Sequence, residues 1–192
     1  HQKFVSGRSS LSGELDYMVE WFKDLTKYNI VVVRSNHDDF VDRWLRDTDW
    51  KQNPQNALAY IEYAAAKLRG EADKGIVPFV LERNFTNIKT LDRSSGFKIK
   101  GWDLGYHGDI GINGSKGSLE QFRKMNVKSI TGHSHSPGRK DGAIAVGTST
   151  KLRMGYNNGP SSWAQAHVII QPDGKAQHII FIGEKLDYTT LD

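Results

Sequence analysis

The stretch "VVVRSNHDDF" (residues 31–40) decides how the fold is interpreted, because apolar strand residues run directly into polar ones. The run Ile30–Val33 is rich in β-branched residues and too short for a helix, so it predicts a buried strand. Four polar residues follow, from Ser35 to Asp38, and their side chains can hold a proton or a metal ion. A polar surface turn would account for them, and so would the catalytic edge of a sheet.

A helix is expected just before this strand, over residues 11–28. Ser12 is the expected N-cap and Asn29 the expected stop. Apolar residues recur every three or four positions, as in a helix with one buried face; they are Leu11, Leu15, Met18, Val19, Phe22 and Leu25. A helix, a strand and a polar loop in this order are typical of a layered α/β fold.

The rest of the chain continues this mixture. Asn53 and Pro54 predict the start of a helix that ends at Gly70 and whose apolar stripe is Leu58, Ile61, Ala65 and Leu68. Further helices are expected from near Phe40 and over residues 118–125. Strands are expected at residues 77–81, 87–91, 97–99, 102–106, 128–131, 143–146, 166–170 and 177–182, the last two forming a hairpin around "QPDGK". We therefore expect one α/β domain over residues 1–192, a layered sandwich of mixed β-sheets flanked by helices.

Composition limits the kinds of site that the chain can hold. The 192 residues include no cysteine, so a metal ion would need histidine, asparagine or carboxylate ligands. No run approaches the ~18 apolar residues of a membrane span, so we expect no membrane partner. The lack of cysteine, and so of disulfides, favours an intracellular protein. The formal charge of +4 is compatible with a polyanionic substrate such as nucleic acid.

Three polar loops share one position relative to the expected strands. Asn36 and His37, then His107, then His133 and His135 each follow a strand candidate. In α/β sheets, ligands collect outside the carboxyl ends of strands. We therefore expect these loops to converge in space although they lie far apart in the sequence.

The loop "GHSHSPG" (132–138) is the strongest of the three. In extended backbone, residues two apart point the same way, so His133 and His135 would face one pocket and bind a metal ion. The alternative is a polar loop with solvated histidines. His107 alone would be an ordinary turn histidine.

The loop at Asn36 offers an amide oxygen as a ligand, and His37 beside it offers a proton donor. Asp38 would either orient His37 or cap the following helix. Asp109 would orient His107 through a hydrogen bond.

Together, "SNHD" (35–38), "HGD" (107–109) and "GHSH" (132–135) resemble the calcineurin-like metallophosphoesterases. The signature of that family is D-x-H, G-D-x-x-D, G-N-H-D/E, H and G-H-x-H, and the resemblance spans about residues 30–183. The tail "GTSTKLRMGYNNGPSSW" (147–163) looks most like phage-type members linked to DNA processing.

The resemblance implies a two-metal hydrolase of phosphoesters, a phosphodiesterase or nuclease with DNA as a candidate substrate. Asn36, His107 and His133 would bind one divalent ion and His135 the other, with Mn²⁺, Fe²⁺, Ni²⁺ or Zn²⁺ as suitable ions. The ions would activate a water molecule as hydroxide, and His37 would protonate the leaving oxygen. A phage-encoded enzyme of this kind would act in the host cytoplasm.

The sequence departs from the family at its start. The D-x-H and G-D-x-x-D blocks are absent, since residues 1–29 contain only Asp16 and Asp24, and Ser35 replaces the usual glycine. We therefore expect the carboxyl-terminal part of a metallophosphoesterase domain, incomplete at the N-terminus. A missing segment or a partner chain would supply the other ligands, and this chain alone would be weak or inactive. The alternative is a degenerate, non-catalytic module that binds nucleic acid or a protein partner.

Other side chains have less specific interpretations. Arg139 belongs to a set of basic residues that either hold phosphates or are solvated surface charges: Lys116, Arg123, Lys124, Lys128, Arg139, Lys140, Lys151 and Arg153. Tyr156 and Trp163 can stack on a base, although we favour packing in a core. His167 and His178 are expected to be structural or solvent-facing.

Overall fold

The computed structural model describes residues 10–182 and 185–187. The chain divides into two compact units, His1–Asp92 and Arg93–Asp192, which are described one at a time. The described residues form five α-helices and several small sheets, so the expected mixed α/β class is confirmed. The expectation of one domain stays a prediction.

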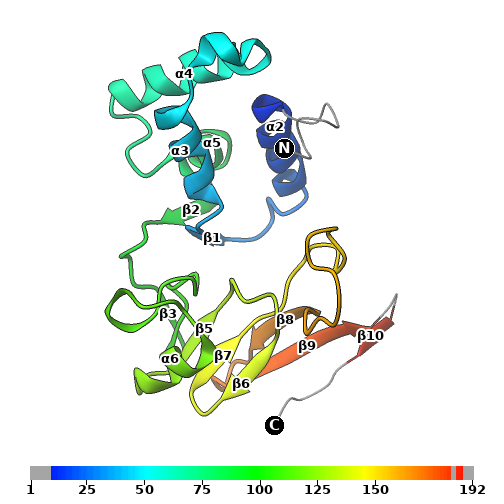
Figure 1. Cartoon of the computed structure of the whole chain (residues 1–192). Helices are drawn as coiled ribbons and strands as arrows, with labels where there is room; N and C mark the ends of the chain where they lie inside the picture. The colour runs from blue at the N-terminus through cyan, green and yellow to red at the C-terminus, as the bar shows by residue number, and fades with distance from the viewer. Residues whose placement is uncertain (1–9, 183–184, 188–192) are drawn as a thin grey trace. The chain divides into compact units, whose positions relative to one another are not determined.

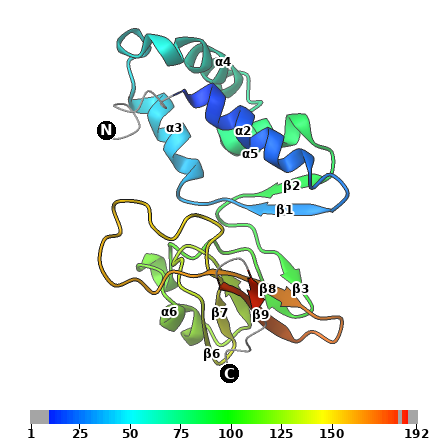
Figure 2. The same cartoon turned by 90° about the vertical axis from the view of Figure 1, so that its right-hand side faces the viewer.

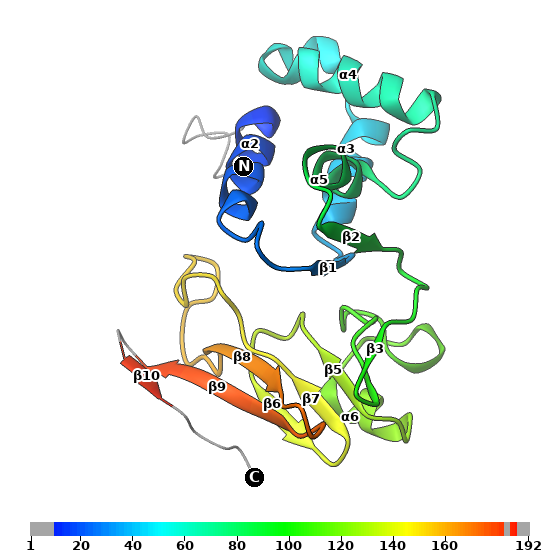
Figure 3. The same ribbon diagram turned by 180° about the vertical axis from the view of Figure 1, so that it is seen from behind.

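The first unit contains four of these helices and a two-stranded sheet (Figure 1). The bounds are α2 Leu11–Lys23, β1 Ile30–Val33, α3 Asp38–Asp47, α4 Ala57–Leu68, α5 Ile76–Asn84 and β2 Ile88–Leu91, with 3-10 turns at Trp50–Gln52 and Pro54–Asn56. Strand β1 pairs with β2 in parallel and is half-buried along its length. Helix α5 contacts α2 and α3, and Figures 1 and 3 show it between them. It is the central helix of this unit.

Helix α5 replaces the strand that was expected at residues 77–81. Five of its nine residues are buried, so its sequence lacks the recurrence of apolar residues every three or four positions that normally reveals a helix. Pro78 lies in the first turn, where a backbone N–H is not needed for the helix. The β-branched residues around it therefore suggested a strand, but the segment is a buried helix.

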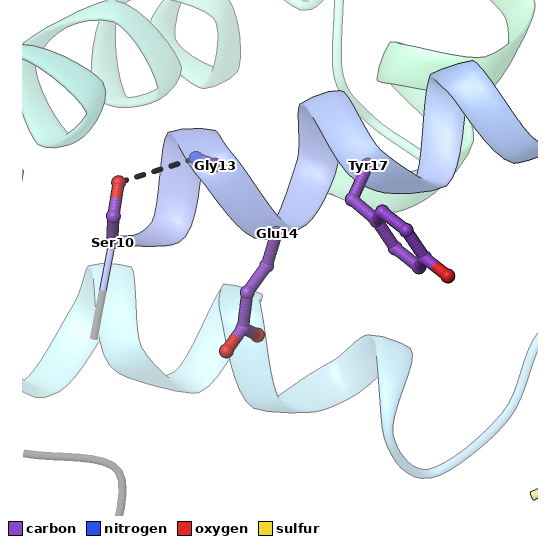
Figure 4. A pocket seen from close by; sticks show the side chains of 4 residues that line it. All are labelled: Ser10, Gly13, Glu14 and Tyr17. Atoms are coloured by element: carbon purple, nitrogen blue, oxygen red, sulfur yellow. Dashed lines mark hydrogen bonds between the residues drawn. The ribbon is translucent and has the colours of Figure 1, made fainter. Parts of the chain in front are cut away.

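Helix α2 begins and ends differently from the prediction. The N-cap is Ser10 rather than Ser12, because the Ser10 hydroxyl accepts a hydrogen bond from the Gly13 N–H at 3.2 Å (Figure 4). The helix ends at Lys23, and the chain continues in turns up to β1. A hollow of about 490 Å³ lies beside this helix, and among the described residues Ser10, Gly13, Glu14 and Tyr17 line it.

Helix α4 ends at Leu68, and Gly70 is the residue beyond its C-cap, as predicted, with φ +73°. The helix begins at Ala57, because Pro54–Asn56 form a 3-10 turn where the first helical turn was expected. The N–H of Gly70 donates to the carbonyl of Lys67 and that of Glu71 to the carbonyl of Ala66, both at 3.0 Å. This pair of bonds is the Schellman arrangement, in which glycine adopts the left-handed conformation at low cost.

The apolar stripe of α4 is exposed, although amphipathic spacing predicted that it would face the core. Leu58 is 85% exposed, Ile61 51% and Leu68 90%. The helix instead buries its opposite face, which consists of Ala59, Tyr63 and Ala66.

Substitution of Leu68 by alanine is expected to change the free energy of unfolding by less than about 0.5 kcal/mol, because the side chain already faces solvent. The matched change Leu81→Ala removes a side chain that is 1% exposed and should cost about 3 kcal/mol. Urea unfolding followed by circular dichroism measures both. A cost above about 1.5 kcal/mol for Leu68→Ala would show that the stripe is covered in solution.

The second unit is a sandwich of two sheets with one helix. The bounds are β3 Lys98–Ile99, β4 Trp102–Asp103, α6 Leu119–Lys124, β5 Ser129–Thr131, β6 Gly138–Lys140, β7 Ala143–Ala145, β8 Gln165–Ile170, β9 Ala176–Ile182 and β10 Lys185–Asp187, with a 3-10 turn at Ile112–Gly114. The first sheet has the order β3-β4-β5-β7-β6, in which β4, β5 and β7 are parallel. The second is the antiparallel sheet β10-β9-β8. Strand β6 was not expected.

Strand β7 shows how the layers form. Successive side chains of a strand point to opposite faces. Ile144 packs in a cluster with Trp102 and Ala176, on the side of the β8–β9 hairpin. Ala143 and Ala145 are also buried, and α6 contacts β7. Figure 2 shows α6 and the hairpin on either side of β7.

The C-terminal hairpin is confirmed. The N–H of Gln171 donates to the carbonyl of Lys175 at 2.7 Å and closes the predicted turn. His178 is buried with its Nε2 3.0 Å from the carbonyl oxygen of Ala145, and His167 is exposed. Both histidines therefore have the structural and solvent-facing positions that were expected. Within the described part of the chain, no helix is both long and apolar enough to cross a membrane.

Candidate functional site

Two histidine loops of the second unit lie side by side. The loop of His107 follows β4 and the loop of His133 follows β5, and these strands are parallel neighbours. The N–H of Gly132 donates to the carbonyl of His107 at 2.8 Å. The imidazole centroids of His107 and His133 are 5.3 Å apart, with the rings at 75°. The structure therefore brings these two predicted ligands together.

Glycines allow this close approach. A Cβ atom at Gly108, where φ is +112°, would lie 2.9 Å from the carbonyl oxygen of Gly132. A Cβ atom at Gly117 would lie 1.9 Å from the carbonyl oxygen of Gly108. The N–H of Gly117 also donates to the carbonyl of Asp109 at 2.8 Å. The segment "HGDIGINGSKG" thus folds back on itself beside the second histidine loop.

The backbone of "GHSH" is not extended, which corrects the argument that His133 and His135 face one pocket because they are two residues apart. His133 has φ +66° and His135 has φ +58°. Few residues other than glycine adopt this left-handed conformation, and such outliers gather at functional sites. The ring of His135 packs edge-on against Trp163, with centroids 4.2 Å apart. This partner was not found from the sequence.

Asp109 is held by an arginine that the sequence analysis missed. Arg93 donates to the Asp109 carboxylate at 2.7 Å, and the carboxylate side chain is 15% exposed. Burial alone would raise the pKa of Asp109, but the hydrogen bond and charge of Arg93 hold this pKa below its ordinary value. The ion pair therefore fixes the loop two residues after His107.

Substitution of Asp109 by asparagine is expected to lower the free energy of unfolding by about 1–2 kcal/mol at neutral pH, through loss of a charged hydrogen bond. Because the folded-state pKa is depressed, the carboxylate stabilises the fold above its ordinary pKa, and this contribution is lost as the pH falls below that value. Urea unfolding at a series of pH values should therefore show the two proteins converging in acid. Asp16→Asn, at an exposed position of helix α2, is the control and should cause no measurable change. A difference that is constant with pH would contradict the role of this ion pair.

In the first unit, "SNHD" forms a capping box at the start of α3. The Ser35 hydroxyl accepts hydrogen bonds from the N–H groups of His37 and Asp38, each at 3.2 Å. The Asp38 carboxylate accepts from the Ser35 N–H at 2.7 Å. This reciprocal pair satisfies backbone donors that the helix leaves free. Asp38 therefore caps the helix, one of its two expected roles, and burial raises its pKa although the Ser35 hydrogen bonds oppose this.

Asn36 and His37 lie inside this turn. Asn36 is half-buried, and His37 is exposed with its ring 5.2 Å from that of Phe40. Both belong to the first unit, and the three other histidines of the predicted site belong to the second. The convergence of Asn36 with His107 and His133 stays a prediction.

A network of ion pairs around Arg34 holds the segment next to this turn in place. Arg34 donates to Asp39 at 2.8 Å and to Asp42 at 3.4 Å, and Asp42 also pairs with Lys67 at 2.7 Å. A further hydrogen bond joins Arg34 to the carbonyl of Lys74. The network links the end of β1 to α3, α4 and the segment before α5.

Arg139 has a structural contact. Its guanidinium donates to the carbonyl of Ala176 at 3.1 Å, which ties β6 to the hairpin. It also borders a hollow of about 470 Å³ together with Lys128 and Lys175. A contact between Arg139 and substrate stays a prediction.

The chain is similar to a curated protein from a phage. Protein A1 of Escherichia phage T5 is 38% identical over 162 residues, which cover 79% of this chain and 29% of that protein. The chain is related to this phage protein. It spans less than a third of the length of that relative. No family model and no solved structure matches the chain.

The two neighbouring imidazoles form an edge-to-face ring contact, and two imidazoles that share a metal ion would have a similar spacing. With metal–nitrogen bonds of about 2.1 Å, two imidazoles on one ion have centroids roughly 4.7–5.4 Å apart. The observed separation of His107 and His133 is 5.3 Å. Among residues 10–182 and 185–187, no group of three or more histidine, aspartate or glutamate side chains is placed to hold a metal ion. The pair is therefore compatible with part of a metal site, and further ligands would have to join it.

Proposed function

We propose that the chain is part of a metal-dependent phosphoesterase of the calcineurin-like type, encoded by a phage and acting in the host cytoplasm. The observation that carries the proposal is the contact between the His107 and His133 loops, with ring centroids 5.3 Å apart. The sandwich of two sheets in the second unit and the order of "SNHD", "HGD" and "GHSH" support the same assignment. The phage relative supports the biological setting.

His107 and His133 would hold one divalent ion with Asn36, and His135 would belong to a second ion. Imidazole and amide ligands suit Mn²⁺, Fe²⁺, Ni²⁺ or Zn²⁺. When bound, such ions activate water as a nucleophile and neutralise charge on the phosphate.

Residues of this chain would donate a proton and position the histidine loops. His37, which is exposed, would donate a proton to the leaving oxygen, a role that histidine often has in enzymes. Arg93 and Asp109 would keep the His107 loop in place.

The remaining ligands would come from an N-terminal segment or a partner chain, since this sequence lacks the D-x-H and G-D-x-x-D blocks. The proposed substrate is a phosphodiester, with DNA as the candidate polymer. The net charge of +4 favours a polyanion, although it does not distinguish DNA from other polyanions.

The test combines metal binding with turnover. Calorimetric titration with Mn²⁺ is expected to show binding to this chain. The hydrolysis assay uses the longest natural polypeptide that contains this sequence. Its hydrolysis of bis-p-nitrophenyl phosphate should require Mn²⁺. The variant His37→Ala is the control and should lose turnover. Absence of metal-dependent hydrolysis in that polypeptide would overturn the assignment.

The second candidate is a non-catalytic module that binds nucleic acid or a protein partner. The capping box favours it, because Ser35 and Asp38 have a local structural role that needs no metal ion. Retained binding of an oligonucleotide without any metal-dependent turnover would support this alternative.

A further inference from the structure

The segment Lys151–Ser162 forms an exposed loop that is held in shape by its own side chains. Arg153 donates to the carbonyl of Gly159 at 2.7 Å. The Asn157 carboxamide accepts from the Met154 N–H at 2.9 Å and donates to the carbonyl of Leu152 at 2.7 Å. Compact surface loops that are packed by their own side chains are frequently functional.

Hydrogen bonds hold both ends of this loop, and its C-terminal end lies beside the "GHSH" loop. The side chain of Gln165 donates to the carbonyl of Thr150 at 3.1 Å and closes the base. The hydroxyl oxygens of Ser162 and Ser136 are 2.7 Å apart. The N–H of Ala164 donates to the carbonyl of His135 at 3.2 Å. The loop is therefore attached to the candidate site.

Three rings connect the two loops. Trp163 packs on His135 with centroids 4.2 Å apart, and Tyr156 lies 6.0 Å from Trp163. Tyr156 is 67% exposed, so the expectation that it packs in a core is wrong. An aromatic ring that is fixed on one side and open on the other is a platform for stacking.

The charge of the loop has one sign. Its sequence, "KLRMGYNNGPSS" (151–162), contains two cations and no acidic residue. Lys151 and Arg153 are both exposed. An exposed aromatic ring next to positive charge is the combination that binds single-stranded nucleic acid, where bases stack and phosphates contact cations.

We propose that this loop binds a single-stranded stretch of nucleic acid by stacking an unpaired base on Tyr156. Trp163 positions Tyr156 relative to His135, so a stacked nucleotide brings a neighbouring phosphodiester towards the histidine loops. The inference rests on the proposed function, because it assigns the substrate class of that same site. A paired base does not offer its face to Tyr156, so single strands are preferred over duplexes.

Binding of fluorescein-labelled oligonucleotides to the full chain tests this, measured by anisotropy in EDTA so that no metal ion takes part. The probes are a dodecamer of thymidylate and a dodecamer of abasic residues with the same charge. The wild type is expected to bind the thymidylate probe more tightly. Tyr156→Ala should weaken that binding about 5–50-fold and leave the abasic probe within about twofold. Tyr156→Phe should retain the wild-type affinity, because the ring is kept.

The matched control is Tyr17→Ala, which removes a tyrosine of similar exposure, 75%, from the first unit. It should leave the affinity for both probes unchanged. Equal binding of both probes by the wild type would overturn the inference, as would an unchanged affinity in Tyr156→Ala or no binding of either probe.

The two proposals fail in different assays. Metal-dependent hydrolysis of bis-p-nitrophenyl phosphate without base-dependent binding would overturn only the inference about the loop. Base-dependent binding that is lost in Tyr156→Ala, without any hydrolysis, would overturn only the phosphoesterase.

Discussion

Replacing His133 by asparagine is expected to weaken Mn²⁺ binding at least about 10-fold and metal-dependent hydrolysis at least about 100-fold. The change removes one of the two imidazoles whose centroids are 5.3 Å apart, so the proposed ion would exchange an imidazole nitrogen for a weaker amide ligand. Asparagine is chosen because it tolerates the left-handed backbone that His133 adopts at φ +66°, so the loop should keep its shape. Calorimetry on this chain gives the affinity, and initial rates on the longest natural polypeptide give the turnover.

The matched control is His167→Asn, which removes an exposed histidine from strand β8 of the same unit. It should leave both quantities unchanged. If His133→Asn bound Mn²⁺ as tightly as the wild type, His133 would not be a ligand, and the proposed centre would have to be abandoned.

Gly117→Ala is expected to have the largest effect on stability, a loss of at least about 3 kcal/mol of unfolding free energy. The new Cβ atom would lie 1.9 Å from the carbonyl oxygen of Gly108 and 2.7 Å from its carbonyl carbon. These are backbone atoms, which cannot move aside as a flexible side chain does, so the loop that carries His107 must shift. Urea unfolding measures the loss, and the nuclear magnetic resonance signals of the His107 ring would report the shift.

Gly96→Ala is the control for this substitution. A Cβ atom at Gly96 meets nothing within 4 Å, and its backbone is not in the left-handed region. It should therefore be neutral or slightly stabilising, because alanine restricts the unfolded chain. Equal stability of Gly117→Ala and the wild type would show that the loop is less tightly packed than described.

Within the second unit, two of the predicted loops meet at the ends of neighbouring strands. His107 and His133 follow two strands that are parallel neighbours, and their loops are in contact as expected. The capping box at Ser35 was also visible in the sequence, because a serine followed three residues later by an acid is its signature.

Other features could not be predicted from local patterns. Arg93 reaches Asp109 and Trp163 reaches His135 across long stretches of chain, and periodicity contains no information about such contacts. Helix α5 is buried on most sides, so it shows neither of the standard periods.

Helix α4 shows a related limit. The face with the larger apolar residues was predicted to be buried. In the structure the buried face is the opposite one, which carries Ala59, Tyr63 and Ala66. Periodicity identified an amphipathic helix, and Gly70 marked its end. The neighbouring helices determined which side was covered.

The pairing of β1 with β2 has a consequence for how the protein is made. Ile30 lies opposite Ile88, whereas the β8–β9 hairpin joins Ile170 to Ala176 across a short turn. Closing a long segment costs more chain entropy before any contact compensates for it, so nearby partners assemble first. During translation, β1 therefore waits unpaired until residue 91 has left the ribosome. Over that interval the unpaired backbone groups and apolar side chains of β1 are open to a chaperone.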